Sequence, residues 1–169
     1  MDILAELEEA VLIYGERAKR ENIAFVYHAP EMLPIIFGDK NRLRQVFINI
    51  IDNALKYSDS GDSVTVTAKE GEDTIEIIIA DTGCGISAVD LPKVKTKFYK
   101  ANSTRRGSGI GLALANEIVM MHGGELLIDS KENVGTTVTV VLPVNLNTNE
   151  NKQSAVAANQ RKDQPSNEE

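Results

Sequence analysis

Three polar side chains recur at helical spacing beside an apolar stripe: Asn49, Asn53 and Lys56. Successive residues of a helix are separated by about 100°, so these three lie on one narrow stripe, with Tyr57 at its edge. A carboxamide oxygen can coordinate Mg²⁺, and a lysine can contact phosphate oxygens. The stripe therefore suits a metal-bound triphosphate, although a solvated helix face that contains asparagine would show the same pattern.

A carboxylate, Asp81, stands directly after a β-branched segment and is followed by two glycines and Ile86. At the end of a strand, a carboxylate can accept a hydrogen bond from the exocyclic amine of a base. Gly83 and Gly85 permit positive φ and close approach of the backbone. A turn that begins with aspartate and binds no ligand is the alternative interpretation of these residues.

A glycine-rich segment precedes the last helical pattern of the chain. It consists of Gly107, Ser108, Gly109, Ile110 and Gly111. The backbone amides of such a segment, together with the N-terminus of the following helix, can bind phosphate. The glycine spacing differs from a dinucleotide-binding fingerprint, and no GxxxxGK[ST] sequence occurs, so a P-loop is excluded. A flexible turn is the alternative.

Hydrophobic periodicity predicts the elements that must position these residues. Apolar residues recur at helical spacing in three segments, which are residues 3–18, 39–55 and 110–122. Five shorter segments rich in β-branched residues predict strands, at residues 23–28, 64–69, 75–80, 126–129 and 136–142. We therefore expect an α+β fold, a two-layer sandwich with three helices on one face of a mostly antiparallel mixed sheet.

The stretch between residues 81 and 111 is too long for an ordinary connection and predicts a functional, mobile loop. Six basic residues gather within it in an otherwise acidic chain: Lys93, Lys95, Lys97, Lys100, Arg105 and Arg106. This local reversal of charge suggests a nearby anion, although a solubilising loop would have the same composition.

The 169 residues are enough for one globular domain, which we expect to span residues 1–143. Residues 144–169 are polar and lack aromatics, which predicts a disordered tail or linker. A formal net charge of −7 disfavours nucleic-acid binding. No apolar run approaches the ~20 residues of a membrane helix, and no signal peptide is evident, so we expect a cytoplasmic location for this chain. A parent protein that is anchored in a membrane is left open. The single cysteine, Cys84, excludes an internal disulfide and is interpreted as a packing residue.

Five motifs, in this order along the chain, resemble the catalytic and ATP-binding domain of sensor histidine kinases over about residues 1–143. They are Asn49-x-x-x-Asn53-Ala54-x-Lys56-Tyr57-Ser58, Asp81-x-Gly83-x-Gly85-Ile86, Phe98-Tyr99, Gly107-x-Gly109-x-Gly111-Leu112 and Gly135-Thr136. The resemblance implies the Bergerat ATP-binding fold of the GHKL superfamily, which type II topoisomerases, mismatch-repair ATPases and a heat-shock chaperone share.

The resemblance also implies roles for individual residues, with Mg²⁺ and ATP as cofactors. Asn53 would bind Mg²⁺, Lys56 and Lys100 would position the γ-phosphate, Tyr57 would cover the nucleotide, and Asp81 would bind the adenine amino group. The further expected ATP contacts are Asn49, Gly83, Gly85, Ile86, Gly107, Ser108, Gly109, Ile110, Gly111, Leu112 and Thr136. The glycines among residues 107–111 would serve as phosphate loop and lid hinge. Asn49, Asn53, Lys56 and Lys100 form the expected catalytic set.

Asn49 favours phosphoryl transfer to a protein over ATP hydrolysis. Hydrolases of the superfamily carry glutamate at this position to activate water, and a carboxamide cannot take a proton at neutral pH. The family's acceptor histidine is followed by an acidic residue, whereas His28 is followed by alanine and His122 by glycine. We therefore expect the acceptor on the protein's own dimerisation and phosphoacceptor domain, a response regulator receiver domain downstream, and a monomeric isolated chain. The alternatives are an anti-sigma-factor-type serine kinase, a GHKL ATPase and a non-enzymatic adaptor.

Overall fold

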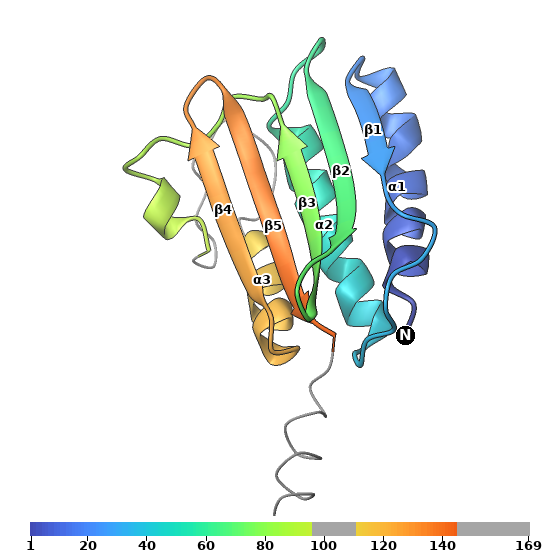
Figure 1. Ribbon diagram of the computed structural model, residues 1–169. Coiled ribbons are helices and arrows are strands. Elements are labelled where there is room, and N and C mark those ends of the chain that lie inside the picture. Colours follow the sequence, from blue (N-terminus) through green and yellow to red (C-terminus); the bar gives the residue numbers. More distant parts are fainter. Residues whose placement is uncertain (96–110, 145–169) are drawn as a thin grey trace, which may run out of the picture.

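A computed structural model describes residues 1–95 and 111–144 and has two layers, a five-stranded sheet and three helices that cover one of its faces (Figure 1). The helices are α1 (Ile3–Arg20), α2 (Lys40–Lys56) and α3 (Gly111–Met121), and a short 3₁₀ helix, η1, spans Leu91–Lys93. The strands are β1 (Ala24–His28), β2 (Ser63–Glu70), β3 (Thr74–Asp81), β4 (Glu125–Lys131) and β5 (Gly135–Pro143). The predicted α+β fold is confirmed.

The strand order is β1-β2-β3-β5-β4, and only the β1–β2 pair is parallel. This pair is parallel because α2 connects the two strands, and such a crossover returns the chain in the same direction. The predicted hairpin of β2 and β3 is present but longer than expected. The strands stay paired up to their polar residues next to the turn, where Lys69 lies opposite Glu76 and forms an ion pair with it at 3.2 Å.

The core lies between the sheet and the helices. Buried and partly exposed residues alternate along β2, β3 and β5, so one face of each strand packs on the helices. Phe47 of α2 is fully buried at the centre of this layer. Asp39 caps α2, as its position before the apolar pattern predicts, and accepts hydrogen bonds from the N–H groups of Asn41 and Arg42.

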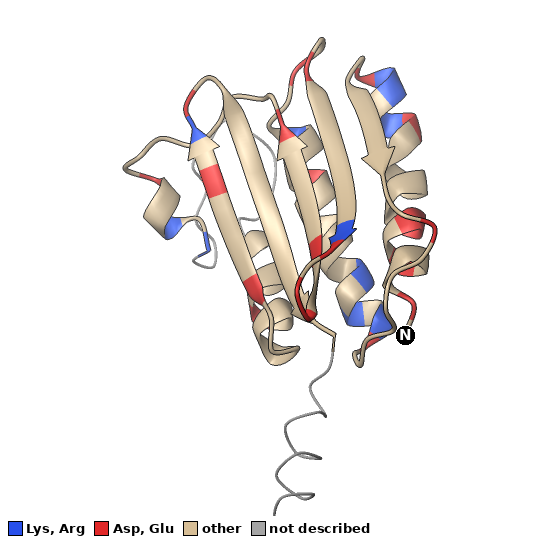
Figure 2. Cartoon of the chain, in the orientation of Figure 1, with Lys and Arg blue, Asp and Glu red and all other residues tan. Residues whose placement is uncertain are grey.

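Two ion-pair clusters fix α1 against α2. Arg44 bonds Glu6 at 2.7 Å through Nε, and Glu6 is itself buried. Near the C-terminal ends of the same two helices, Arg17 of α1 donates to Asp52 of α2 at 2.7 Å. These contacts fix the position of α2 and its rotation about its own axis relative to α1. The polar residues of α2 that make no contact with α1 therefore have one fixed orientation. Charges are otherwise sparse on the strands and concentrate on the helices and loops (Figure 2).

In the described part of the chain, none of the helices combines the length and the apolar composition that a membrane span requires. The predicted polar tail, residues 145–169, lies outside the described residues. The same is true of residues 96–110, which include Lys100 and the expected contacts Gly107, Ser108, Gly109 and Ile110.

Candidate functional site

The polar stripe predicted on the second helix is present on α2, and its first residue lies beside the start of α3. Asn49 Nδ2 approaches the carbonyl oxygen of Gly111 at 3.4 Å. Asn49 Oδ1 accepts a hydrogen bond from Gln45 at 2.6 Å. The Asn49 carboxamide is therefore held in a defined orientation, and the residue that ends the glycine-rich segment is placed against the stripe.

The last turn of α2 carries the rest of the stripe. Asn53, Lys56 and Tyr57 are all half-buried, and the helix ends at Lys56 with Tyr57 as its C-cap. Lys56 Nζ lies 5.5 Å from the centre of the Tyr57 ring, a distance at which a cation is attracted to an aromatic face. The stripe therefore ends in an amide oxygen, a cation and an aromatic ring within two helical turns.

The segment after β3 packs directly on this end of α2. Gly83 N–H donates to Asp81 Oδ1 at 2.9 Å, and Cys84 N–H donates to the Tyr57 carbonyl at 3.1 Å. A Cβ atom at Gly83 would lie 2.1 Å from the same Tyr57 oxygen, which no side chain could tolerate. Glycine is required here for close backbone approach, as the sequence predicts, and the approach brings Asp81 to the end of the α2 stripe.

The turn between β4 and β5 closes the other side of this segment. Gly85 has φ +66°, and a Cβ atom there would lie 2.0 Å from the Lys131 carbonyl oxygen. Asn133 N–H donates to the Cys84 carbonyl at 2.7 Å. Gly135, at the start of β5, would place a Cβ atom 2.0 Å from the Asp81 carbonyl oxygen. The loop that follows Asp81 is thus enclosed between α2 and the β4–β5 turn.

The environment of Asp81 changes its acidity. Burial raises the pKa of Asp81 to about 6, against backbone hydrogen bonds from Gly83 and Thr136 that lower it, and the Asp62 charge adds a smaller upward effect. At neutral pH the carboxylate is therefore ionised in an enclosed position. Such a group accepts hydrogen bonds only, and its desolvation favours a ligand that donates one.

The structure thus brings together most of the predicted residues that it describes. Asn49, Asn53, Lys56 and Tyr57 share one face of α2. Gly83 and Cys84 contact Tyr57 at its C-terminal end, and Thr136 lies opposite Asp81 in the sheet. Gly111 joins the stripe through Asn49, and Leu112 packs in the core behind it.

One residue of this region was not predicted from the sequence. Ser130 of β4 accepts a hydrogen bond from Ile86 N–H at 2.8 Å and lies 2.8 Å from the Thr136 hydroxyl. The available signal was its position, because Leu126 and Ile128 face the helices and the alternation of a strand puts Ser130 on the same side.

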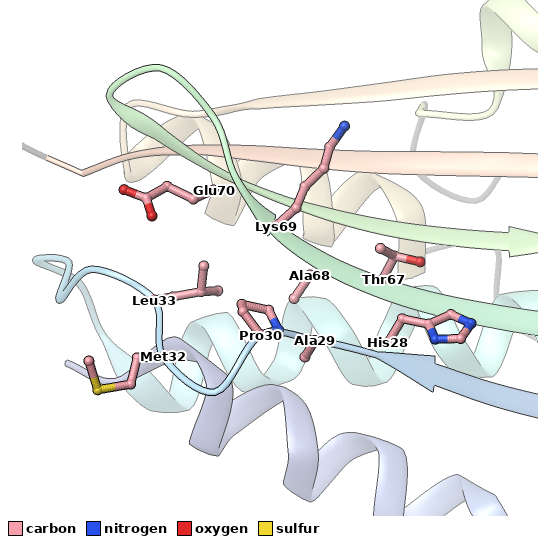
Figure 3. A pocket seen from close by; sticks show the side chains of 9 residues that line it. All are labelled: His28, Ala29, Pro30, Met32, Leu33, Thr67, Ala68, Lys69 and Glu70. Atoms are coloured by element: carbon pink, nitrogen blue, oxygen red, sulfur yellow. The ribbon is translucent and has the colours of Figure 1, made fainter.

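Two hollows in the described surface lie away from Asp81. One, of ≈ 370 Å³, lies where β1 ends beside the last residues of β2, and Pro30, Leu33 and Ala68 face one another there (Figure 3). The other, of ≈ 400 Å³, lies between the ends of α1 and α2 and includes Lys56 in its lining. The first hollow contains none of the predicted site residues.

The metal-binding groups at the site fit a magnesium ion that is bound mainly by nucleotide phosphates and water. Among residues 1–95 and 111–144, no group of three or more His, Cys, Asp or Glu side chains could hold a metal ion. A carboxamide oxygen is a ligand that Mg²⁺ accepts, and Mg²⁺ commonly binds through one protein group, waters and substrate phosphates. Asn53 fits an ion that arrives with a nucleotide rather than an ion held by the protein alone.

Comparison with known proteins agrees with this geometry. Residues 38–146, more than half of the chain, match the family described as the histidine kinase-, DNA gyrase B- and HSP90-like ATPase. The chain belongs to this family. Membership of this ATPase family implies ATP binding, and it confirms the superfamily that the sequence motifs indicate.

Named relatives of this ATPase-family chain are sensor kinases. The chain is 39% identical over 134 residues to the sensor histidine kinase WalK of Bacillus subtilis, covering 76% of this chain and 22% of that protein. It is 32% identical over 148 residues to the signal transduction histidine-protein kinase BaeS of Escherichia coli, covering 85% of this chain and 32% of that protein. The chain therefore spans between about a fifth and a third of the length of these relatives.

Solved structures share the fold. The mycobacterial sensor histidine kinase MprB matches with a TM-score of 0.75 and 28% identity, over 85% of this chain and 96% of that one. The catalytic domain of the histidine kinase ThkA matches with a TM-score of 0.75 over 85% of this chain and 93% of that one, at 21% identity. The two-layer arrangement of Figure 1 is thus that of histidine kinase catalytic domains.

Proposed function

We propose that this chain is the ATP-binding catalytic domain of a two-component sensor histidine kinase. In this role it binds Mg·ATP and transfers the γ-phosphate to a histidine on a separate dimerisation and phosphoacceptor domain. The observation that carries the proposal is the convergence at α2: Asn49 contacts Gly111 at one end of the stripe, and Tyr57 receives Cys84 N–H at the other. The names of its relatives and its family membership support the same function.

The proposal gives each group one role. Asp81 accepts a hydrogen bond from the adenine amino group, and Tyr57 covers the nucleotide. Asn53 offers an amide oxygen to Mg²⁺, which when bound neutralises phosphate charge. Lys56 and Lys100 position the γ-phosphate. Phosphoryl transfer is mostly positioning and charge stabilisation, so no further catalytic group is required in this chain.

Transfer to a protein is favoured over hydrolysis by the state of Asn49. Its amide donates towards Gly111 and accepts from Gln45, and it has no group that takes a proton from water at neutral pH. The chain therefore turns over ATP slowly when alone, and fast hydrolysis without a partner would contradict the assignment. In the whole protein, a response regulator receives the phosphoryl group.

The metal assignment is tested by Asn53→Ala, with Asn41→Ala as the matched control on the same helix. Asn53→Ala should abolish Mg·ATP binding in a calorimetric titration while the domain remains folded by circular dichroism. Asn41 is exposed at the opposite end of α2, so its variant should bind like the wild type. Unchanged nucleotide affinity in the Asn53 variant would refute the role.

The acceptor class is tested by presenting two substrates to the chain with Mg·ATP. A histidine-bearing helical hairpin should be phosphorylated, and a protein with only serine acceptors should not. The opposite result would favour the serine kinase alternative, which shares the fold and much of the motif order but needs no partner histidine.

A further inference from the structure

Three polar side chains form a row across β3, β5 and β4 on the face of the sheet that packs on the helices. Asp81 and Thr136 are cross-strand partners, and Thr136 is in turn the partner of Ser130. Thr136 is 8% exposed, and the next residues of the same face, such as Val138, are apolar and buried. Thr136 and Ser130 therefore interrupt the apolar pattern of this face beside Asp81, the carboxylate proposed to bind adenine.

Ser130 is the centre of the hydrogen bonds in this row. Its Oγ accepts from Ile86 N–H at 2.8 Å, donates to the Gly135 carbonyl at 3.0 Å, and lies 2.8 Å from Thr136 Oγ1. One hydroxyl thus connects the loop after Asp81 with the first two residues of β5. Without it, a part-buried backbone N–H and a buried hydroxyl would each lose a partner.

The protons of the two hydroxyls determine what the row offers to a ligand. A hydroxyl carries a single proton, and Ser130 gives its proton to the Gly135 carbonyl. Thr136 is then the donor in its contact with Ser130, so Thr136 Oγ1 has only lone pairs left for a ligand. The ionised Asp81 also only accepts. Both neighbouring groups therefore present acceptors.

We infer that Ser130 is a positioning residue for base selection: it orients the Thr136 hydroxyl as an acceptor beside Asp81 and fixes the turn at Ile86. Adenine carries an exocyclic amine that donates, whereas guanine carries a carbonyl oxygen at the equivalent position. When this position of the base lies at Asp81, as proposed, the row of acceptors binds the amine of adenine and repels the carbonyl oxygen of guanine. Ser130 contributes to this selection without touching the nucleotide. This inference rests on the proposed ATP-binding function.

The test measures dissociation constants of the whole chain for Mg·ATP and Mg·GTP. Ser130→Ala should weaken ATP binding about ten-fold, the size expected when a buried polar group loses its partner. GTP binding should fall less, because the freed Thr136 hydroxyl can turn and donate a hydrogen bond to the carbonyl oxygen of guanine. The ratio of the two dissociation constants, and with it the preference for ATP, should therefore decrease. Ser130→Thr keeps the hydroxyl and should restore the preference. Thr139→Ala, on the opposite face of β5, is the matched control and should leave both constants unchanged.

The two possible failures are distinguishable. A wild-type chain that binds neither nucleotide contradicts the proposed function itself. A wild-type chain that prefers ATP, together with a Ser130→Ala chain of equal preference, overturns the inference and leaves the function standing. Should Ser130→Ala not fold, Thr136→Val removes the oriented hydroxyl at constant shape and should narrow the preference. An unaltered preference in that variant would overturn the inference equally.

Discussion

The sheet has two ends, one where β3 finishes and one where β3 begins (Figure 1). At the first end three glycines let backbone segments meet closely, whereas at the second a side chain connects two helices. At the first end, Cβ atoms at Gly83, Gly85 and Gly135 would lie 2.0–2.1 Å from carbonyl oxygens. At the other end, His122 Nε2 accepts a hydrogen bond from Asp39 N–H at 3.0 Å and thereby connects α3 to the cap of α2. A Cβ atom at Gly124 would also lie close to a backbone atom at this second end, 2.3 Å from the Val141 carbonyl oxygen, so the second end combines one such approach with the contacts of one ring.

The two ends also differ in what they leave exposed. Beside His122 and Gly38, Met121 is 70% exposed and Phe37 is 76% exposed. The end near Asp81 places a half-buried carboxylate and an amide-bearing helix face next to the closely packed backbone. Tight backbone packing thus fixes polar groups in place at the candidate site.

The largest effect should follow from Gly83→Ala. The added Cβ atom would overlap the Tyr57 carbonyl oxygen, so either the loop or the end of α2 must move. We expect a loss of about 3 kcal/mol in the free energy of unfolding, measured in urea, and loss of nucleotide binding. Gly15→Ala is the matched control, since nothing lies within 4 Å of its Cβ position in α1, and it should stabilise by about 0.5–1 kcal/mol. Equal stability of the two variants would show that the end near Asp81 is not closely packed.

A smaller effect should appear in the pH dependence of stability. Burial raises the pKa of Asp81 from 3.8 to about 6, so between these values the folded state binds more protons than the unfolded state. The free energy of unfolding should therefore fall as the pH rises from about 4 to 6, an effect that Asp81→Asn removes. ATP affinity should change in the opposite direction, because only the ionised carboxylate accepts from the base. Identical urea midpoints against pH in both chains would contradict this assignment.

The architecture could be predicted from sequence because its signals are local. The apolar stripe of α2, the cap at Asp39 and the alternation of β3 each follow from neighbouring residues. The contacts of the site could not be predicted, because they join residues distant in the chain. Asn49 meets Gly111 across 62 positions, and Ile86 meets Ser130 across 44. No periodicity in either segment encodes such a pairing. Family resemblance supplied the motif residues, but not Ser130.

The smallest effect, and the sharpest contrast between the two ends, should come from His122→Phe. The imidazole contacts the Ile118 carbonyl through Nδ1 at 2.7 Å while Nε2 accepts from Asp39 N–H, so a neutral ring with its proton on Nδ1 satisfies both. Phenylalanine keeps the ring but removes both bonds. The backbone groups at Asp39 are exposed to water, so the expected loss is about 1 kcal/mol in a urea titration. Nucleotide affinity should not change, because this substitution leaves α2, α3 and the core between them packed. A parallel fall in ATP affinity would show that the two ends are coupled.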